Sequence, residues 1–104
     1  MKNIEGKVPY QLVPVEAMEQ YALAMAYGAK KHKIDDWREG KGMPWCWLIA
    51  AILRHTFKVL AGEDFDKDSG LPHMAHVMAS ASMLLYYLTY KKRYDQDDRF
   101  TNDF

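Results

Sequence analysis

Apolar residues recur with a helical spacing in two stretches of the chain. Within residues 15–31 the recurring apolar positions are Val15, Met18, Tyr21, Ala22, Met25 and Ala29. Within residues 73–93 they are Val77, Ala81, Leu84, Leu85 and Leu88. This spacing places each set on one stripe of an amphipathic α-helix, and no stretch shows the strict alternation of a half-buried strand. The pattern predicts an all-α protein.

A third stretch, residues 45–62, has a helical character but is apolar on nearly every side. Its large apolar residues are Trp45, Trp47, Leu48, Ile49, Ile52, Leu53, Phe57 and Leu60. A helix of this kind lies at the centre of a protein or in an interface. Three long helices make a thin monomer that leaves part of this surface exposed. We therefore expect a homo-oligomer, either a homodimer or a homotetramer.

Proline and glycine mark the ends of the predicted helices. Pro14, Pro44 and Pro72 each directly precede one of the three stretches. Proline is favoured at the start of a helix, because its missing N–H has no intrahelical partner there. Gly62 stands where a glycine is expected after the second helix.

The chain has 104 residues, which is the length of one domain. We predict a single helical domain over residues 1–104, a small bundle of three long helices. An extended N-terminal arm, residues 1–13, precedes the bundle, and an acidic C-terminal tail, residues 94–104, follows it.

Composition narrows the class of protein. The formal net charge is zero and the pI is about 6.9, so no overall basic field favours duplex nucleic acid as a partner. The single cysteine, Cys46, has no second cysteine in the chain to pair with, which favours a reducing compartment. The N-terminal residues lack the apolar core of a signal peptide, and no apolar run reaches the roughly 20 residues of a membrane span. We expect a soluble cytoplasmic protein with no membrane partner.

The stretch GEDFDKDSGLPHMAH, residues 62–76, contains four carboxylates and two histidines. Counted from Asp64, a calcium-binding EF-hand requires glycine at its sixth position and glutamate at its twelfth. This chain has Ser69 and Ala75 at those positions. Calcium binding of this kind is therefore not expected.

The two histidines of this stretch allow two further interpretations. His73 and His76 are three residues apart and share a helical face, so with Glu63 or Asp64 they would offer ligands to a transition metal. Alternatively, the carboxylates cap the third helix and the histidines hydrogen-bond to their neighbours. Only two of the four ligands that zinc usually needs are assigned, so we predict no metal site and no cofactor.

An anion site is another interpretation of the same region. The short loop over residues 62–71 makes the second and third helices antiparallel neighbours, which brings Arg54 and His55 toward His73 and His76. The positive N-terminal end of the third helix favours an anion there. An ion pair between Arg54 and Glu63 or Asp66 is the alternative.

Aromatic residues near a basic cluster provide candidates for base stacking. The cluster KKHK, residues 30–33, precedes a segment that contains three tryptophans. Trp37 stands in a predicted loop and Tyr10 in the arm, where either ring is free to stack on a nucleobase. The predicted ligand-binding residues are Tyr10, Lys30, Trp37, Arg54, His55, His73 and His76.

Four sequence blocks together carry a family resemblance: PYQLVPVEAM, YGAKKHKIDDW, LIAAILRH and GEDFDKDSGLPHMAH. In this order they resemble the dATP/dGTP diphosphohydrolase N-terminal family of small phage proteins. The family usually has asparagine at the positions of Asp36 and Ser80. The chain is also similar to small helical phage sponges, which are oligomers that sequester 3′3′-cGAMP and related cyclic dinucleotides without cleaving them. The resemblance implies a purine nucleotide or a cyclic dinucleotide as partner.

The residues favour binding over hydrolysis. Magnesium-dependent hydrolysis needs several carboxylates beside the phosphates, and the predicted helices supply one E-x-x-E pair, Glu16 and Glu19. No histidine is followed by aspartate, and Cys46 between two tryptophans is expected to be buried and inert.

We therefore predict no catalytic residue. The predicted function is that of a phage sponge that sequesters cyclic dinucleotides such as 3′3′-cGAMP and so blocks CBASS-type defence in the host cytoplasm. The alternative is a dATP/dGTP diphosphohydrolase that acts on purine deoxynucleoside triphosphates with a divalent metal such as Mg²⁺.

Overall fold

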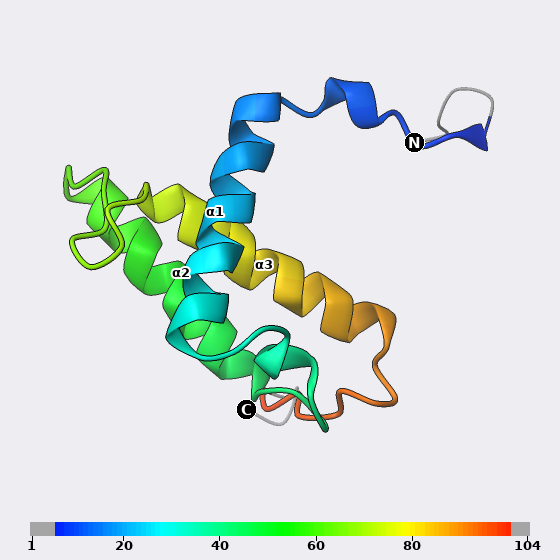
Figure 1. Cartoon of the computed structure of the whole chain (residues 1–104). Coiled ribbons are helices and arrows are strands. Elements are labelled where there is room, and N and C mark those ends of the chain that lie inside the picture. Colours follow the sequence, from blue (N-terminus) through cyan, green and yellow to red (C-terminus); the bar gives the residue numbers. More distant parts are fainter. Residues whose placement is uncertain (1–5, 101–104) are drawn as a thin grey trace.

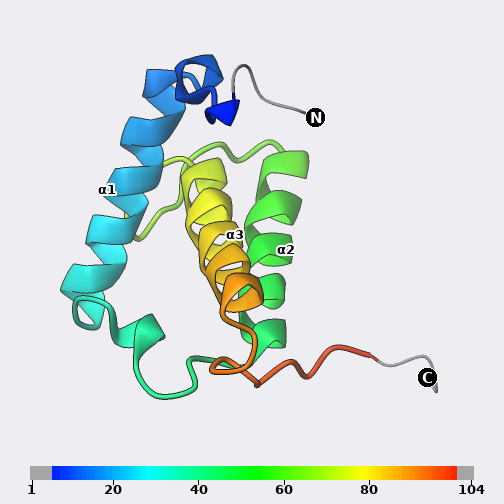
Figure 2. The same cartoon turned by 90° about the vertical axis from the view of Figure 1, so that its right-hand side faces the viewer.

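Helix α3 packs against both of the other long helices (Figure 1), and the turned view shows it between them (Figure 2). The computed structural model describes residues 6–100. In that range the elements are η2 (Tyr10–Leu12), α1 (Val15–Lys31), η3 (Asp36–Arg38), α2 (Trp45–Leu60) and α3 (His73–Thr89), where η denotes a short 3-10 helix. β pairing within residues 6–100 is limited to an isolated bridge between Phe65 and Pro72. The predicted all-α bundle is confirmed.

Proline stands immediately before each long helix, as the sequence predicted. Pro14, Pro44 and Pro72 occupy the N-cap positions, and no side-chain capping hydrogen bond forms at any of them. α2 ends at Leu60 rather than at residue 62. The chain then turns through Gly62, whose φ of +97° is strained for any residue with a side chain.

The third helix is shorter than predicted. It ends at Thr89 rather than at residue 93, because Tyr90 takes a non-helical conformation with φ −113° and ψ 47°. The side chain of Arg93 then donates hydrogen bonds to the main-chain oxygens of Arg38 and Gly40. These bonds to the segment before α2 take the place of a further helical turn.

Two groups of buried residues hold the helices together. Between α2, α3 and the segment after α3, the buried residues are Trp45, Leu48, Tyr87 and Tyr94. Between α1 and α3 they are Ala24, Ala75 and Ala79. Small side chains at this second contact let two helices approach closely. The central helix is therefore α3. The sequence-based suggestion that the second helix is central is wrong, and its alternative, an interface, stays a prediction.

Tyr87 connects α3 to the segment that leads into α2. Its side chain is fully buried, and its hydroxyl donates to the carbonyl oxygen of Trp37 at 2.6 Å and accepts from the N–H of Met43 at 3.1 Å. Gly42 lies against this ring with φ +75°, and a Cβ atom there would come within 2.8 Å of it. Only glycine fits both the backbone conformation and the space.

Residues 94–100 form an arm that docks on the N-terminal turn of α2. Trp45 N–H donates to the carbonyl oxygen of Gln96 at 3.1 Å, and Cys46 N–H donates to Asp98 Oδ1 at 2.9 Å. These bonds satisfy helix N–H groups that Pro44 cannot cap. Tyr94, placed in the tail by the sequence analysis, is a core residue that is 1% exposed. The last four residues of that tail, 101–104, lie outside the described residues.

Cys46 is half-buried rather than fully buried. Its thiol donates to the carbonyl oxygen of Asp98 at 3.4 Å. Hydrogen bonding to Asp98, together with burial and the nearby carboxylates, raises the pKa of the thiol. A raised pKa keeps the sulfur protonated and unreactive.

One face of the molecule is apolar and open. A groove of about 340 Å³ runs between α2 and α3, and its lining residues are Trp45, Ile49, Ile52, Ala81, Leu84, Leu85, Leu88 and Arg99. Leu53, Phe57 and Leu60 of α2 are exposed as well. The segment that contains Tyr10 leads away from the three helices (Figures 1 and 2) and exposes its own apolar side chains.

We expect this apolar face to be covered by a second copy of the chain, because large exposed apolar patches mark association sites. Light scattering should give a mass that is a multiple of 12.1 kDa. Leu88→Glu, which places a charge in the groove, should shift the mass toward that of one chain. Wild-type protein that scatters as a single chain at micromolar concentration would contradict the expectation.

Removal of the Tyr87 hydroxyl should destabilise the fold. Tyr87→Phe leaves the Met43 N–H and the Trp37 carbonyl without their partner, which should lower the free energy of unfolding by about 1–3 kcal/mol in urea titrations. The control is Tyr90→Phe at an exposed tyrosine, where a change within about 0.5 kcal/mol is expected. Equal stability of both variants would show that the Tyr87 hydroxyl contributes little.

Candidate functional site

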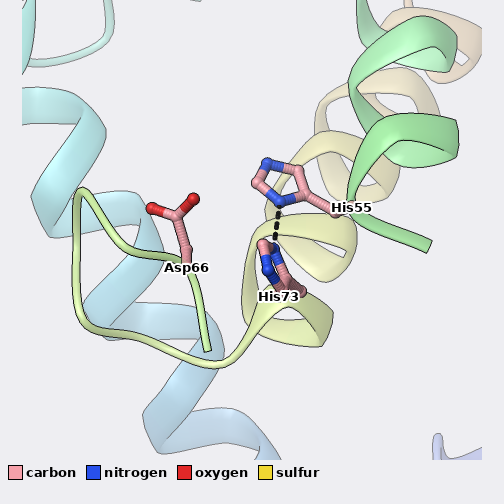
Figure 3. Close-up of side chains that lie close together, drawn as sticks. All are labelled: His55, Asp66 and His73. Carbon is pink, nitrogen blue, oxygen red and sulfur yellow. Dashed lines mark hydrogen bonds between the residues drawn. The ribbon is translucent and has the colours of Figure 1, made fainter. Parts of the chain in front are cut away.

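Three histidines meet where α2 and α3 lie side by side. His55 comes from α2, and His73 and His76 come from the first turn of α3. The Nδ1 atoms of His55 and His73 are 2.8 Å apart, and the rings of His55 and His76 are stacked with centroids 4.9 Å apart (Figure 3 shows the first pair). The antiparallel arrangement predicted from the short loop therefore brings these three predicted site residues together.

The loop between α2 and α3 is held by its own hydrogen bonds. Asp66 N–H donates to the carbonyl oxygen of Leu71, and Gly70 N–H donates to that of Asp66, both at 2.8 Å. His73 N–H donates to the carbonyl oxygen of Asp64 at 2.9 Å. Asp66 Oδ2 accepts from Ser69 N–H at 2.9 Å. The suggested capping of the third helix by these carboxylates is wrong, because Pro72 is the N-cap and the carboxylate of Asp66 closes a turn within the loop.

The loop also supplies polar partners to two of the histidines. Glu63 Oε2 lies 2.7 Å from His73 Nε2, and Ser69 Oγ lies 2.7 Å from His76 Nε2. Asp66 Oδ2 is 3.8 Å from the same nitrogen of His76. The cluster thus joins three imidazoles, two carboxylates and a hydroxyl from two helices and one loop.

For the case in which the rings of His55 and His73 are both neutral, the hydrogen bonds fix where their protons lie. A carboxylate only accepts, so His73 Nε2–H donates to Glu63. The Nδ1 atom of a neutral His73 is then an acceptor, and His55 Nδ1–H donates to it. His55 Nε2 is left with a free lone pair. A nitrogen in this state is suited to accept a proton or to bind a cation.

Burial and neighbouring charges set the ionisation of the cluster. Burial, followed by His76 and His73, lowers the pKa of His55. Burial lowers the pKa of His76 more than Asp66 raises it. The hydrogen bond from His73 lowers the pKa of Glu63. Burial alone would raise the pKa of Asp66, but the hydrogen bonds from Ser69 outweigh it and the pKa is lowered. Near neutral pH the cluster therefore holds ionised carboxylates beside neutral His55 and His76.

Arg54 and Lys30, the two predicted phosphate contacts with fixed charge, are both exposed. Arg54 precedes His55 on α2 and lowers its pKa slightly. Its suggested ion pair with a loop carboxylate does not form among the described residues, because Glu63 contacts His73 and Lys67 instead. Lys30 lies in the last turn of α1. Arg54 is thus placed at the margin of the cluster, and both cations are exposed to solvent.

The two predicted stacking residues lie elsewhere. Trp37 packs edge-on against Tyr86 with ring centroids 5.1 Å apart, and the guanidinium of Arg38 lies 4.8 Å from its ring centroid. Tyr86 follows His76 on α3 by roughly 15 Å along the helix axis, at 1.5 Å per residue. Tyr10 is 78% exposed in the N-terminal arm. The structure does not bring either ring to the histidines of the same chain.

A different aromatic residue borders the cluster. The ring of Tyr27 meets that of His76 edge-on, with centroids 5.8 Å apart. The sequence analysis missed Tyr27, although it lies three residues before Lys30 and therefore on the same face of α1. It also left Glu63, Asp66 and Ser69 out of the predicted site, although all three stand in the acidic loop that it singled out.

One set of atoms in the cluster has the spacing of metal ligands. One atom each of His55, Asp66 and His73 lie within 4.8 Å of one another. Two imidazoles and one carboxylate do not fit magnesium, which prefers oxygen ligands alone. The magnesium ion of the hydrolytic alternative therefore finds no matching ligand set in this cluster.

Comparison with known proteins gives the family. The model of the family described as dATP/dGTP diphosphohydrolase, N-terminal, matches residues 1–99. The chain belongs to this family. A protein of Salmonella phage PMBT28 named dATP/dGTP diphosphohydrolase is 31% identical over 99 residues, which are 95% of this chain and 32% of that protein. The chain thus spans about a third of the length of this relative.

No solved structure is significantly similar to the chain. No helix among residues 6–100 has both the length and the hydropathy that a membrane crossing requires.

Stability should depend on pH through His55 and His76. Both pKa values are below the ordinary 6.5 in the folded chain, so the unfolded chain takes up protons first as the pH falls. The stabilisation is complete above pH 6.5 and decreases as the pH falls toward the folded pKa values. Glu63 and Asp66, whose ordinary values are 4.5 and 3.8, add a further loss only at lower pH.

Melting temperatures between pH 8 and 5 should therefore decrease with falling pH, and His55→Gln should reduce that dependence. His32→Gln is the matched control, because His32 is exposed and outside the cluster. Equal pH dependence in wild type and His55→Gln would contradict the assignment to His55.

Proposed function

We propose that this chain binds a purine nucleotide at the histidine cluster and releases it chemically unchanged. The family and the named phage relative both concern purine deoxynucleotides. The observation that carries the proposal is that the exposed cations Arg54 and Lys31 lie close enough to the three converging histidines to lower the pKa of His55 and of His76, respectively. Ammonium and guanidinium groups donate charge-assisted hydrogen bonds to the oxygens of a phosphate.

The placement of the carboxylates supports binding without hydrolysis. Glu63 and Asp66 are engaged by His73 and Ser69. Glu16 and Glu19 are exposed near the start of α1, whereas α1 reaches the cluster at Tyr27 near its end. Eight residues separate Glu19 from Tyr27, which is roughly 12 Å of helix. An array of acidic oxygens around a phosphate-bound metal is therefore not assembled from these residues.

Cyclic dinucleotides such as 3′3′-cGAMP are the ligands we favour for such a sponge. A ligand with two phosphates and two bases gains from two cationic sites and two stacking surfaces. One chain would supply one cationic site and one stacking surface. A second copy of the chain would supply the other cationic site and the other stacking surface, including the exposed Tyr10 of its arm. Sequestration of this signal by a phage protein would block CBASS-type defence.

Diphosphohydrolysis remains the second candidate, because the relative carries that name and because His55 Nε2 has a free lone pair. A neutral imidazole in this state can act as a general base toward water. The reaction would convert a purine deoxynucleoside triphosphate and water into the monophosphate and pyrophosphate.

A single incubation separates the two candidates. The protein is mixed with dATP, dGTP or 3′3′-cGAMP in the presence of Mg²⁺, separated from free ligand, heated, and analysed by chromatography. The proposal expects the bound nucleotide to return intact and no product in the mixture. Release of deoxynucleoside monophosphate and pyrophosphate would establish the enzyme instead.

Loss of the exposed cation beside the cluster should weaken binding. Arg54→Ala removes a charge-assisted contact of about 1.5–3 kcal/mol, so affinity should fall roughly tenfold or more in calorimetric titrations. The melting temperature should stay the same, because Arg54 is exposed. Lys92→Ala, after the end of α3, is the control of equal charge. Lower stability with unchanged affinity would assign Arg54 to the scaffold.

A further inference from the structure

We propose that His55, Asp66 and His73 form a binding site for a divalent transition-metal ion with the preferences of Zn²⁺. One atom of each residue lies within 4.8 Å of the other two. Figure 3 shows the three side chains converging from α2, the loop and α3. The proposed metal site does not depend on nucleotide binding, because all three ligands are side chains of the chain itself.

Glu63 gives the site a partner typical of metal-binding histidines. Its carboxylate accepts the Nε2–H of His73 at 2.7 Å, which directs Nδ1 of that ring toward His55. A carboxylate behind a histidine fixes the ring and makes the facing nitrogen a better ligand. His73 is 2% exposed, so its orientation is set by these contacts rather than by solvent.

The carboxylate of Asp66 is held in place before any metal arrives. The loop around it is closed by main-chain hydrogen bonds to Leu71 and from Gly70. Ser69 N–H holds Oδ2 of the same carboxylate at 2.9 Å. A ligand fixed in this way loses little conformational freedom when it binds a cation.

The ligand types select the class of metal. Two imidazoles with one carboxylate suit zinc and neighbouring transition metals, whereas calcium and magnesium prefer oxygen. Three protein ligands leave one position of a tetrahedron for water or for another ligand. The ring of His76 borders the three residues, because it is stacked on that of His55.

Metal binding requires a small rearrangement of the rings of His55 and His73. The Nδ1 atoms are 2.8 Å apart, joined by a hydrogen bond. Two nitrogens on one tetrahedral zinc ion are about 3.3 Å apart at zinc–nitrogen distances of about 2.0–2.1 Å. The rings therefore separate by about half an ångström, and the proton on His55 Nδ1 moves to Nε2. No proton leaves the pair of neutral rings.

The experiment titrates chelator-treated full-length protein with Zn²⁺ alone and reads the heat of binding and the melting temperature. One ion per chain is expected, with a rise in melting temperature. Mg²⁺ in place of Zn²⁺ should leave both readouts unchanged. Co²⁺ reports the same ligands by visible absorption.

Three variants and one control test the assignment. Glu63→Gln should keep one site per chain but weaken Zn²⁺ binding about 10–100-fold, because it acts through His73. His55→Ala and Asp66→Asn remove ligands and should weaken binding further. His32→Ala removes an exposed histidine outside the cluster and should bind as wild type does.

Circular dichroism confirms that each variant is folded, and Asp66→Asn keeps the size and an acceptor oxygen of the native side chain. The proposal is overturned if wild-type protein takes up no Zn²⁺. It is equally overturned if His55→Ala and Asp66→Asn bind like wild type, or if His32→Ala loses as much affinity as they do.

Discussion

The burial of one imidazole, that of His73, governs the geometry of the whole cluster. A buried polar group needs hydrogen-bond partners, and this ring has two nitrogens to satisfy. Glu63 meets one and His55 meets the other. Glu63 lies just after α2, and His55 lies on α2 itself. The ring of His73 on α3 therefore fixes both α2 and the start of the loop. The main-chain bond from His73 to Asp64 adds a third tie at the same residue. A loop with this many constraints is a rigid part of the fold, although it is acidic and lies at the surface.

Tyr87 plays the corresponding part at the other end of α3. Its hydroxyl joins Trp37 and Met43, which flank a segment that has little regular structure of its own. Docking of residues 94–100 then supplies the N–H partners that proline denies to the first turn of α2. The helix that carries His55 is thus fixed at its start by the C-terminal arm and near its end by the histidines. Between these ends α2 buries only one side, which leaves its apolar outer surface for another partner.

The sequence was informative where local rules decide the outcome. Apolar spacing and three prolines located the helices, and the length of the loop placed His55 against His73 and His76. Predictions from the sequence were incomplete or wrong where tertiary contacts decide the structure. The apolar α2 was suggested as central, but the small Ala75 and Ala79 let α1 pack closely on α3, and larger buried residues join α3 to α2. The roles of Glu63 and Asp66 depend on turn geometry that composition does not encode. Trp37 stays a predicted stacking residue, and in the structure its ring contacts Tyr86 and Arg38.

The charge of the histidine cluster links the proposed metal site to the proposed nucleotide binding. Ionised Glu63 and Asp66 beside neutral His55 and His76 give a site whose own charge is negative, which does not attract phosphate. Cations at the margin, such as Arg54, must then outweigh these carboxylates through direct charge-assisted hydrogen bonds to the phosphate. A divalent ion bound between His55, Asp66 and His73 would cancel both carboxylate charges at their source. The marginal cations would then act on a phosphate without opposition, and the ion's open position would accept one of its oxygens. In this way a site with few fixed positive groups, in a chain with no net charge, would attract a phosphate.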